Sequence, residues 1–191
     1  MYRVGRDKRK LISAGLICDG LNGLLKKTAF QNISVTAIVE AAGVGRTTFY
    51  RLFDDKTDVI LYQTETLFDG IIERERAAAE PSKNHDVSFV FLFEFWLKRR
   101  ELFLALIDAN LYESFQNRLA VIVEKKLSFL KQAVNIDDRG WKYFINIRAS
   151  MLFTALKVAV LNYQDDTAAD IAGTLSLLFG NKPEFMRETH F

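Results

Sequence analysis

A short polar stretch after residue 45 carries the side chains best suited to contact a polyanion. Arg46 and Arg51 offer guanidinium groups, Thr47 and Thr48 offer short hydroxyls, and Tyr50 adds a phenol. Groups of this kind bind phosphate oxygens, and they also read base edges in the major groove of DNA. Their types and spacing predict a nucleic-acid contact, although Thr and Arg on a short helix are also typical of an ordinary solvated surface.

Residues suited to enzymatic chemistry are sparse. The chain has two histidines, His85 in an expected turn and His190 next to the last residue, and a single cysteine, Cys18. This set provides neither a nucleophile beside a base nor the ligands of a metal site, and one cysteine forms no internal disulfide. We therefore expect no enzymatic activity, no metal and no cofactor, and we expect a reducing cytoplasm as the location.

Charge is unevenly distributed along the 191 residues. The first 56 residues carry ten Lys or Arg against five Asp or Glu, a net charge of +5, and the rest carry 16 against 19, a net charge of −3. The N-terminal part is therefore the part expected to face an anion. Its Arg3 and Arg6 would enter a minor groove, screen phosphates, or belong to a disordered solvated tail. The apolar stretches 87–97 and 149–161 are too short to span a bilayer, so no membrane contact is expected.

Helical periodicity dominates, which predicts an all-α protein of about nine helices. The first helix is expected over 7–27, and its inward side should be formed by Leu11, Ile12, Leu16, Leu21, Leu24 and Leu25. A second helix should begin after the N-cap residue Ser34 and end at Gly43, and a third should cover 46–52. A long fourth helix is expected over 56–79, where Asp55 and Asp58 fit a capping box.

The later helices are expected over 86–98, 101–112, 115–134, 139–162 and 167–179. The phenylalanines at 89, 91, 93 and 95 alternate with a period of two, which is typical of a half-buried strand. Their intervening neighbours are also apolar, and this favours a helix that is buried nearly all round.

The second and third helices, with the tight turn at Gly43 between them, form a helix-turn-helix. Phe49 and Phe53 lie four residues apart and should point inward together. The whole motif reads S-V-T-A-I-V-E-A-A-G-V-G-R-T-T-F-Y-R-L-F-D-D-K from Ser34 to Lys56.

This order of features resembles the tetracycline-repressor (TetR) family of bacterial regulators over about residues 8–59. The resemblance implies a helix-turn-helix DNA-binding domain at 1–55, a connecting helix at 56–79, and a helical effector-binding and dimerisation domain at 80–191. It also implies a sequence-specific transcriptional regulator, by default a repressor that is released by a small apolar or aromatic effector. The alternative is an architectural DNA-binding or partner-binding helical protein without an effector.

By similarity to the family, the DNA-contacting residues fall within the motif and at the start of the next helix. They are Ser34, Thr36, Arg46, Thr47, Thr48, Tyr50, Arg51 and Lys56. Two positions depart from the family pattern. Gly45 stands where a capping Ser is usual, and Thr36 stands where a longer basic residue is frequent, so a base contact from Thr36 is in doubt.

One short recognition helix buries too little surface for tight specific binding, so we expect a homodimer on a near-palindromic site in double-stranded DNA. Small residues of the last two helices would form the interface, although such stripes also suit packing within one chain. They are Ala155, Ala159, Ala169, Ala172, Gly173 and Ser176.

The resemblance also implies a ligand pocket after residue 80, with aromatic walls and a few polar groups. Its candidate residues, each of which would also suit an ordinary core, are Phe89, Phe93, Glu94, Trp96, Phe103, Tyr112, Asn146 and Arg148. Glu94 and Arg148 would need partners if they were buried. An enclosed apolar cavity would favour sensing, and a filled interior would favour an architectural role.

Overall fold

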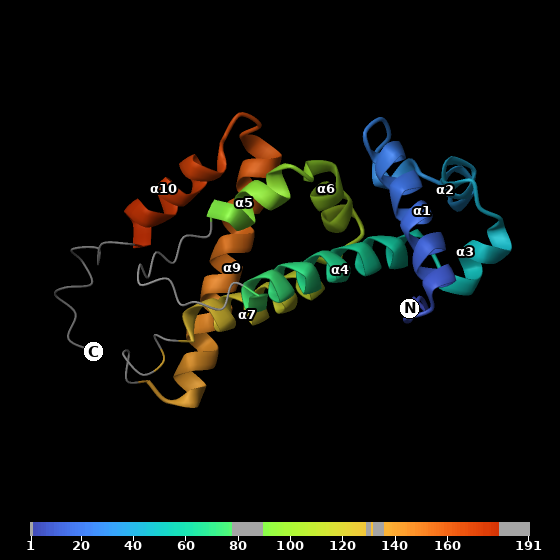
Figure 1. Ribbon diagram of the computed structural model, residues 1–191. Coiled ribbons are helices and arrows are strands. Elements are labelled where there is room, and N and C mark those ends of the chain that lie inside the picture. The colour runs from blue at the N-terminus through green and yellow to red at the C-terminus, as the bar shows by residue number, and fades with distance from the viewer. Residues whose placement is uncertain (1, 78–89, 129–130, 132–135, 180–191) are drawn as a thin grey trace. The chain divides into compact units, whose positions relative to one another are not determined.

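The computed structural model describes residues 2–77, 90–128, 131 and 136–179. Over these residues the chain forms nine α-helices, one short 3-10 helix and no strand (Figure 1). The predicted all-α fold is therefore confirmed. Two compact units divide the chain: unit 1 comprises residues 1–80 and 101–118, and unit 2 comprises 81–100 and 119–191. The domain boundaries expected from the sequence remain a prediction.

Unit 1 contains the N-terminal helices. Their bounds are α1 Lys8–Leu25, the 3-10 helix Phe30–Asn32, α2 Val35–Ala42, α3 Arg46–Leu52 and α4 Lys56–Ala77. Nearly all of α6, Arg100–Asp108, and the first part of α7, Tyr112–Leu127, belong to the same unit. α1 contacts α2, α3 and α4, and Figure 1 shows it beside the short helices of the motif.

The buried face of α1 differs from the predicted one. Ala14, Ile17 and Leu21 are buried and follow one side of the helix, whereas Ile12 and Leu16 are exposed. At 100° per residue the two exposed side chains lie on the opposite side from Ala14 and Leu21. Leu11 is exposed as well, so the prediction that these three residues face inward is wrong. The helix is apolar on more than one side, and contact with α2, α3 and α4 selects the side that is buried.

Gly20 allows α1 and α2 to approach each other closely. A Cβ atom added at Gly20 would lie 2.9 Å from the backbone nitrogen of Ala42 and 3.1 Å from the carbonyl oxygen of Ile38. Both neighbours are backbone atoms, so the helices would have to separate to accommodate a side chain. Gly20 therefore fixes the position of the helix-turn-helix on α1.

An aromatic cluster joins α4, α6 and α7 within unit 1. The ring of Phe115 lies edge-on to Phe68 at 4.9 Å and to Phe103 at 5.5 Å between centroids, and all three residues are buried. Tyr112 opens α7 and does not end the preceding helix as expected. Such edge-to-face pairs favour one fixed packing of the three helices.

Unit 2 is built from α5, Val90–Leu97, the end of α7, α9, Asp138–Asn162, and α10, Ala168–Phe179. α5 is helical, as the apolar residues between its phenylalanines predicted, and it packs against both α9 and α10. Within this unit, the Arg100 guanidinium donates a hydrogen bond to the Val160 carbonyl oxygen of α9. Phe93 and Trp96 lie in this core.

Among the described helices, α9 is the one whose length and composition would allow it to cross a membrane. It extends over 25 residues, beyond the 149–161 stretch that was expected to be too short. In its most apolar window 39% of the residues are buried inside the protein, and the core helix of a soluble protein can have the same length and composition. One such helix is weak support for a membrane span.

Candidate nucleic-acid interface

The two helices of the motif have well-formed ends around their turn. The Ser34 hydroxyl accepts a hydrogen bond from the Ala37 amide at 3.1 Å, so Ser34 is the predicted N-cap of α2. At the other end Gly43 has a φ of 64°, a left-handed conformation that glycine adopts readily. The Gly43 and Val44 amides donate to the carbonyl oxygens of Glu40 and Val39, as in a Schellman motif. This turn sets the angle between α2 and α3.

α3 is anchored by its apolar side. Phe49 and Leu52 are fully buried, and the Phe49 ring packs against Phe53 at 5.8 Å between centroids. Tyr50 is 52% exposed and rests edge-on against Phe49 at 5.4 Å. The predicted inward direction of Phe49 and Phe53 is thus confirmed, and the opposite side of α3 is left for solvent or a ligand.

The outer side of α3 carries the predicted contact residues. Arg46, Thr47 and Arg51 are exposed, and Thr48 is half-buried. The Arg46 guanidinium donates a hydrogen bond to the Thr36 hydroxyl, which joins the first turn of α3 to the first turn of α2. The structure therefore brings Thr36 and Arg46 together on one surface.

The ammonium group of Lys56 points into the protein. It donates to the carbonyl oxygens of Phe30, Gln31 and Ile33 at 2.8, 2.9 and 2.8 Å, and it lies 4.7 Å from the centroid of the Phe30 ring. An ammonium has three protons to donate, and these three carbonyls use all of them. The resemblance offers either the amide or the ammonium of Lys56 for the DNA backbone; here the ammonium ties α4 to the segment before α2, and a contact through the amide stays a prediction.

The capping box of α4 forms with a change of partner. The Asp55 carboxylate accepts from the Asp58 amide at 3.0 Å, as expected of an N-cap residue. In return the Asp58 carboxylate accepts from the Asp54 amide at 2.8 Å, one residue earlier than in the standard box. The start of α4 is thus fixed close to the end of α3.

The residues predicted to line a ligand pocket differ in how deeply they are buried. Phe93, Trp96 and Phe103 are buried, Arg148 is half-buried, and Phe89 lies outside the described residues. Glu94, Tyr112 and Asn146 are exposed, so the Glu94 charge needs no buried partner. The Asn146 amide donates to the Lys142 carbonyl oxygen at 2.8 Å, and the Arg148 guanidinium lies 5.3 Å from the Phe144 ring centroid. Phe103 and Tyr112 belong to unit 1 and the other described residues to unit 2.

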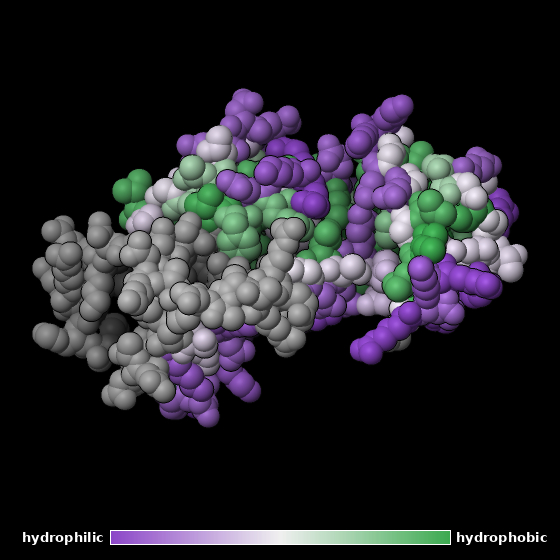
Figure 2. All heavy atoms as spheres, in the orientation of Figure 1, coloured by the Kyte–Doolittle hydropathy of each residue, from purple (hydrophilic) through white to green (hydrophobic). Residues whose placement is uncertain are grey.

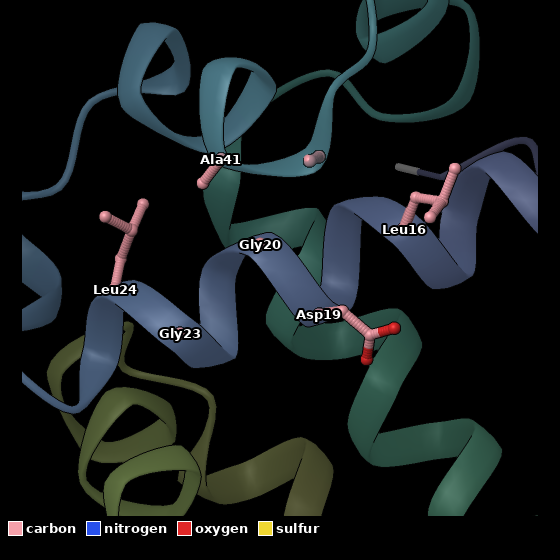
Figure 3. A pocket seen from close by; sticks show the side chains of 7 residues that line it. Leu16, Asp19, Gly20, Gly23, Leu24 and Ala41 are labelled. Carbon is pink, nitrogen blue, oxygen red and sulfur yellow. The ribbon is translucent and has the colours of Figure 1, made fainter.

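An open pocket of about 250 Å³ lies in unit 1 between α1 and α2. In Figure 3, Leu24 extends from α1 toward Ala41 of α2, Leu16 lies further along α1, and Asp19 points away from α2. The pocket is open to solvent, so it is not the enclosed apolar cavity that a sensing function would require. Among the described residues, no group of three or more His, Cys, Asp or Glu is placed to hold a metal ion.

The last two helices expose apolar side chains at regular spacing. On α9, Ile147 is 66% exposed, and Val158 and Leu161 on the same side are also exposed. On α10, Leu177 is 78% exposed, and Figure 2 shows hydrophobic surface at the tip of this helix. We call this set of α9 and α10 side chains the exposed apolar stripe.

The small residues predicted for the interface lie only partly on that side. Ala169, Gly173 and Ser176 of α10 are exposed, Ala155 and Ala172 are half-buried, and Ala159 is buried in the core of unit 2. The Ala159 prediction is therefore corrected: small residues at helical spacing serve packing within the chain on α9.

Comparison with known proteins assigns the N-terminal region. Residues 17–62 match the model of the bacterial regulatory proteins of the tetR family, and this range contains α2, α3 and the end of α1. The chain matches no curated protein. Among solved structures it is similar to the dihydroxyacetone kinase operon activator DhaS, with a TM-score of 0.66 and 16% identity over 88% of this chain and 94% of that chain. That likeness concerns the fold, and the family match concerns the N-terminal region: residues 17–62 form a DNA-binding domain of the tetR family, and the chain is a DNA-binding transcriptional regulator.

Proposed function

We propose that the outer side of α3 and the first turn of α2 contact the DNA of a specific operator. In this proposal Arg46 and Thr47 read base edges in the major groove, and Ser34, Thr48, Tyr50 and Arg51 contact phosphates. The observation that carries it is the bond between Arg46 and Thr36, because it gathers the N-terminal ends of two helices on one exposed surface. The positive balance of residues 1–56 supports the same surface.

The test is selection of binding sites from random duplex DNA, followed by a salt titration of the selected site. Thr47→Val should change which sequences are selected, because a hydroxyl that reads a base edge is lost. Tyr50→Phe should weaken every duplex to a similar degree, because the phenol would bind a phosphate. A wild-type protein that prefers no duplex over a heparin-like polyanion at physiological salt would contradict the proposal.

We propose further that the protein acts as a homodimer on a near-palindromic operator. The exposed apolar stripe supports this, because side chains as exposed as Ile147 and Leu177 are stabilised when a second copy removes them from water. In a symmetric dimer the same stripe would meet its own copy across a two-fold axis. Two copies of α3 would then enter neighbouring major grooves, about 34 to 36 Å apart.

An apolar or aromatic small molecule would suit the aromatic interior of unit 2, where Phe93, Trp96 and Trp141 are buried. A thermal-shift screen with such compounds tests it, since a ligand that binds only the folded state raises the melting temperature. No stabilisation by any compound would favour the alternative, an architectural regulator without an effector, and the exposure of Glu94 and Asn146 also favours it.

We propose a cytoplasmic, non-enzymatic regulator that represses when it occupies DNA. DhaS is described as an operon activator, so activation is the outcome to set against repression. A reporter gene behind the selected operator decides between them. Reporter expression should rise when the gene for this protein is deleted, and a fall would reverse the proposed sign.

A further inference from the structure

The N-terminal segment runs against the end of the recognition helix. The Arg3 amide donates to the Leu52 carbonyl oxygen at 2.7 Å, and the Arg3 guanidinium donates to the Tyr50 carbonyl oxygen at 3.3 Å. Leu52 is the last residue of α3, and Tyr50 lies in its last turn. The guanidinium also forms an ion pair with Asp54. Arg3 therefore binds two of the carbonyl oxygens that a helix leaves without an internal partner at its C-terminus.

The residues on either side hold Arg3 in this place. Val4 is buried, with 1% of its surface exposed. The Tyr2 ring lies edge-on to Tyr62 of α4 at 5.1 Å, and its hydroxyl donates to the Glu65 carboxylate. Arg118 of α7 lies 3.8 Å from that same carboxylate and 3.6 Å from Asp69. Burial, together with the hydrogen bond to Glu65, raises the pKa of the Tyr2 phenol, which favours the neutral form that donates to the carboxylate.

We infer that residues 2–4, the N-terminal strap, cap the C-terminus of the recognition helix α3, and that Arg3 positions α3 on DNA without binding a phosphate itself. α3 has seven residues, and Gly45 gives it no side-chain cap at its start. A helix this short gains little from its own hydrogen bonds, so an external cap at the other end contributes a large share of its order. A cation at a helix C-terminus is also favoured by the helix dipole.

This inference deepens the proposed function and rests on it, because it assigns the arm residue Arg3 a role other than minor-groove insertion. The matched control is Arg6, which is exposed and forms no hydrogen bond or ion pair with the described residues. Arg3→Ala removes the guanidinium and keeps the amide donor. Arg3→Pro removes both, because proline has no N–H.

The experiment measures the melting temperature of each full-length variant and its affinity for the selected operator and for unrelated duplex, as a function of salt. Affinities are taken at a temperature at which every variant is folded. The melting temperature should fall from wild type to Arg3→Ala and further to Arg3→Pro, and Arg6→Ala should match wild type. Operator affinity of Arg3→Ala should fall by roughly five- to tenfold, the loss expected of a cap. Affinity for unrelated duplex and the salt slope should stay at their wild-type values.

Two results would overturn the inference. A salt slope reduced by about 0.9 in Arg3→Ala would mean that Arg3 neutralises a phosphate. Wild-type melting temperature and operator affinity in both Arg3 variants would mean that the strap does not hold α3. If the wild type prefers no duplex, the proposed function fails, and the order of melting temperatures still decides whether the strap caps the helix.

Discussion

Lys56 shows how a cation beside a DNA-binding element can serve the fold. Its ammonium is shared among three carbonyl oxygens, two of which belong to the 3-10 helix and the third to Ile33, next to the N-cap residue of α2. Moving this charge to a phosphate would leave those three acceptors without their donor. The geometry therefore assigns Lys56 the task of joining the N-terminus of α4 to the start of α2.

Lys56→Met should destabilise the protein without altering its contacts to DNA phosphates. The free energy of unfolding should fall by about 1 to 3 kcal/mol, the range for hydrogen bonds to a charged group. The salt slope of operator binding should remain that of the wild type, whereas Arg51→Met should reduce the slope by about 0.9. Urea unfolding and a salt titration measure the two quantities. A lower slope for Lys56→Met, with unchanged stability, would show that its ammonium reaches the DNA.

Cys18 gives the N-terminal unit a specific sensitivity to alkali. Burial, and to a smaller extent the nearby Asp19 carboxylate, raise the pKa of the thiol from 9.0 to about 12. Between these two values the unfolded chain loses a proton that the folded chain keeps. Stability from this group is therefore complete below about pH 9 and is lost as the pH rises toward 12.

Cys18→Ala should flatten the decline of stability at alkaline pH. Between about pH 9 and 10.5 the free energy of unfolding of the wild type should fall more steeply than that of the variant, by up to about 1.4 kcal/mol per pH unit. The variant should be less stable at pH 7, because a cavity replaces the sulfur. Urea titrations across this pH range measure how the free energy of unfolding changes with pH in the two proteins. If the two curves ran parallel, the pKa of the thiol would be the same in the folded and the unfolded chain, and the prediction would fail.

At the scale of helices, the ends were predictable because local residues determine them. Ser34 caps α2, Gly43 ends it, and Asp55 precedes α4, all within a few residues of the element that they bound. The inward face of α1 was not predictable in this way. Its exposed Ile12 and Leu16 are as apolar as its buried residues, and the choice between sides depends on contacts with α2, α3 and α4, which lie later in the chain.

The same reason explains the limits at the candidate site. The residue types of α3 predicted which side chains would be exposed, because Phe49 had to point inward. The direction of the Lys56 ammonium depends on carbonyl oxygens at residues 30 to 33. Every residue has a backbone carbonyl, so the sequence does not show which of them the ammonium will reach. Likewise, nothing in the composition of the first residues distinguishes a strap that caps α3 from a solvated tail.

Substitutions of two glycines in α1 should have opposite effects. Gly20→Ala places a Cβ atom 2.9 Å from backbone nitrogen, so it should destabilise the protein by about 1 to 3 kcal/mol, as overpacking does. Gly15→Ala meets no atom within 4 Å and should stabilise it by about 0.5 to 1 kcal/mol through helix propensity. Thermal and urea unfolding of the two variants measure the difference. Equal effects would mean that α1 and α2 are not in close contact at Gly20.

At the scale of the whole molecule, the positive charge and the exposed apolar surface lie in different parts of the chain. The positive charge balance is concentrated in residues 1–56, and the most exposed apolar residues of unit 2, Ile147 and Leu177, lie on its last two helices. We therefore propose that DNA contact and self-association belong to different parts of the chain. A variant that loses only self-association should therefore keep its fold and its non-specific attraction to DNA.

Val158→Glu, combined with Ile147→Glu, should convert a dimer into a folded monomer. Both side chains are exposed in the single chain, so the new charges cost little there, but in a symmetric interface they would face their own copies and lose water. Val121→Glu on α7 is the matched control, because Val121 is 48% exposed against 41% for Val158 and lies on a helix outside the stripe. Sedimentation at micromolar concentration should give a dimer for wild type and control and a monomer for the double variant.

Operator binding connects this result to function. The monomeric variant should keep the helical circular dichroism of the wild type and bind unrelated duplex with a similar affinity per subunit. Its affinity for the operator with two half-sites should fall by about 100-fold or more, because the second DNA-binding domain no longer binds as part of the same complex. A double variant that remains dimeric would remove the stripe from the interface. A monomeric wild type that binds its operator tightly would show instead that one recognition helix with its N-terminal strap supplies enough contact surface.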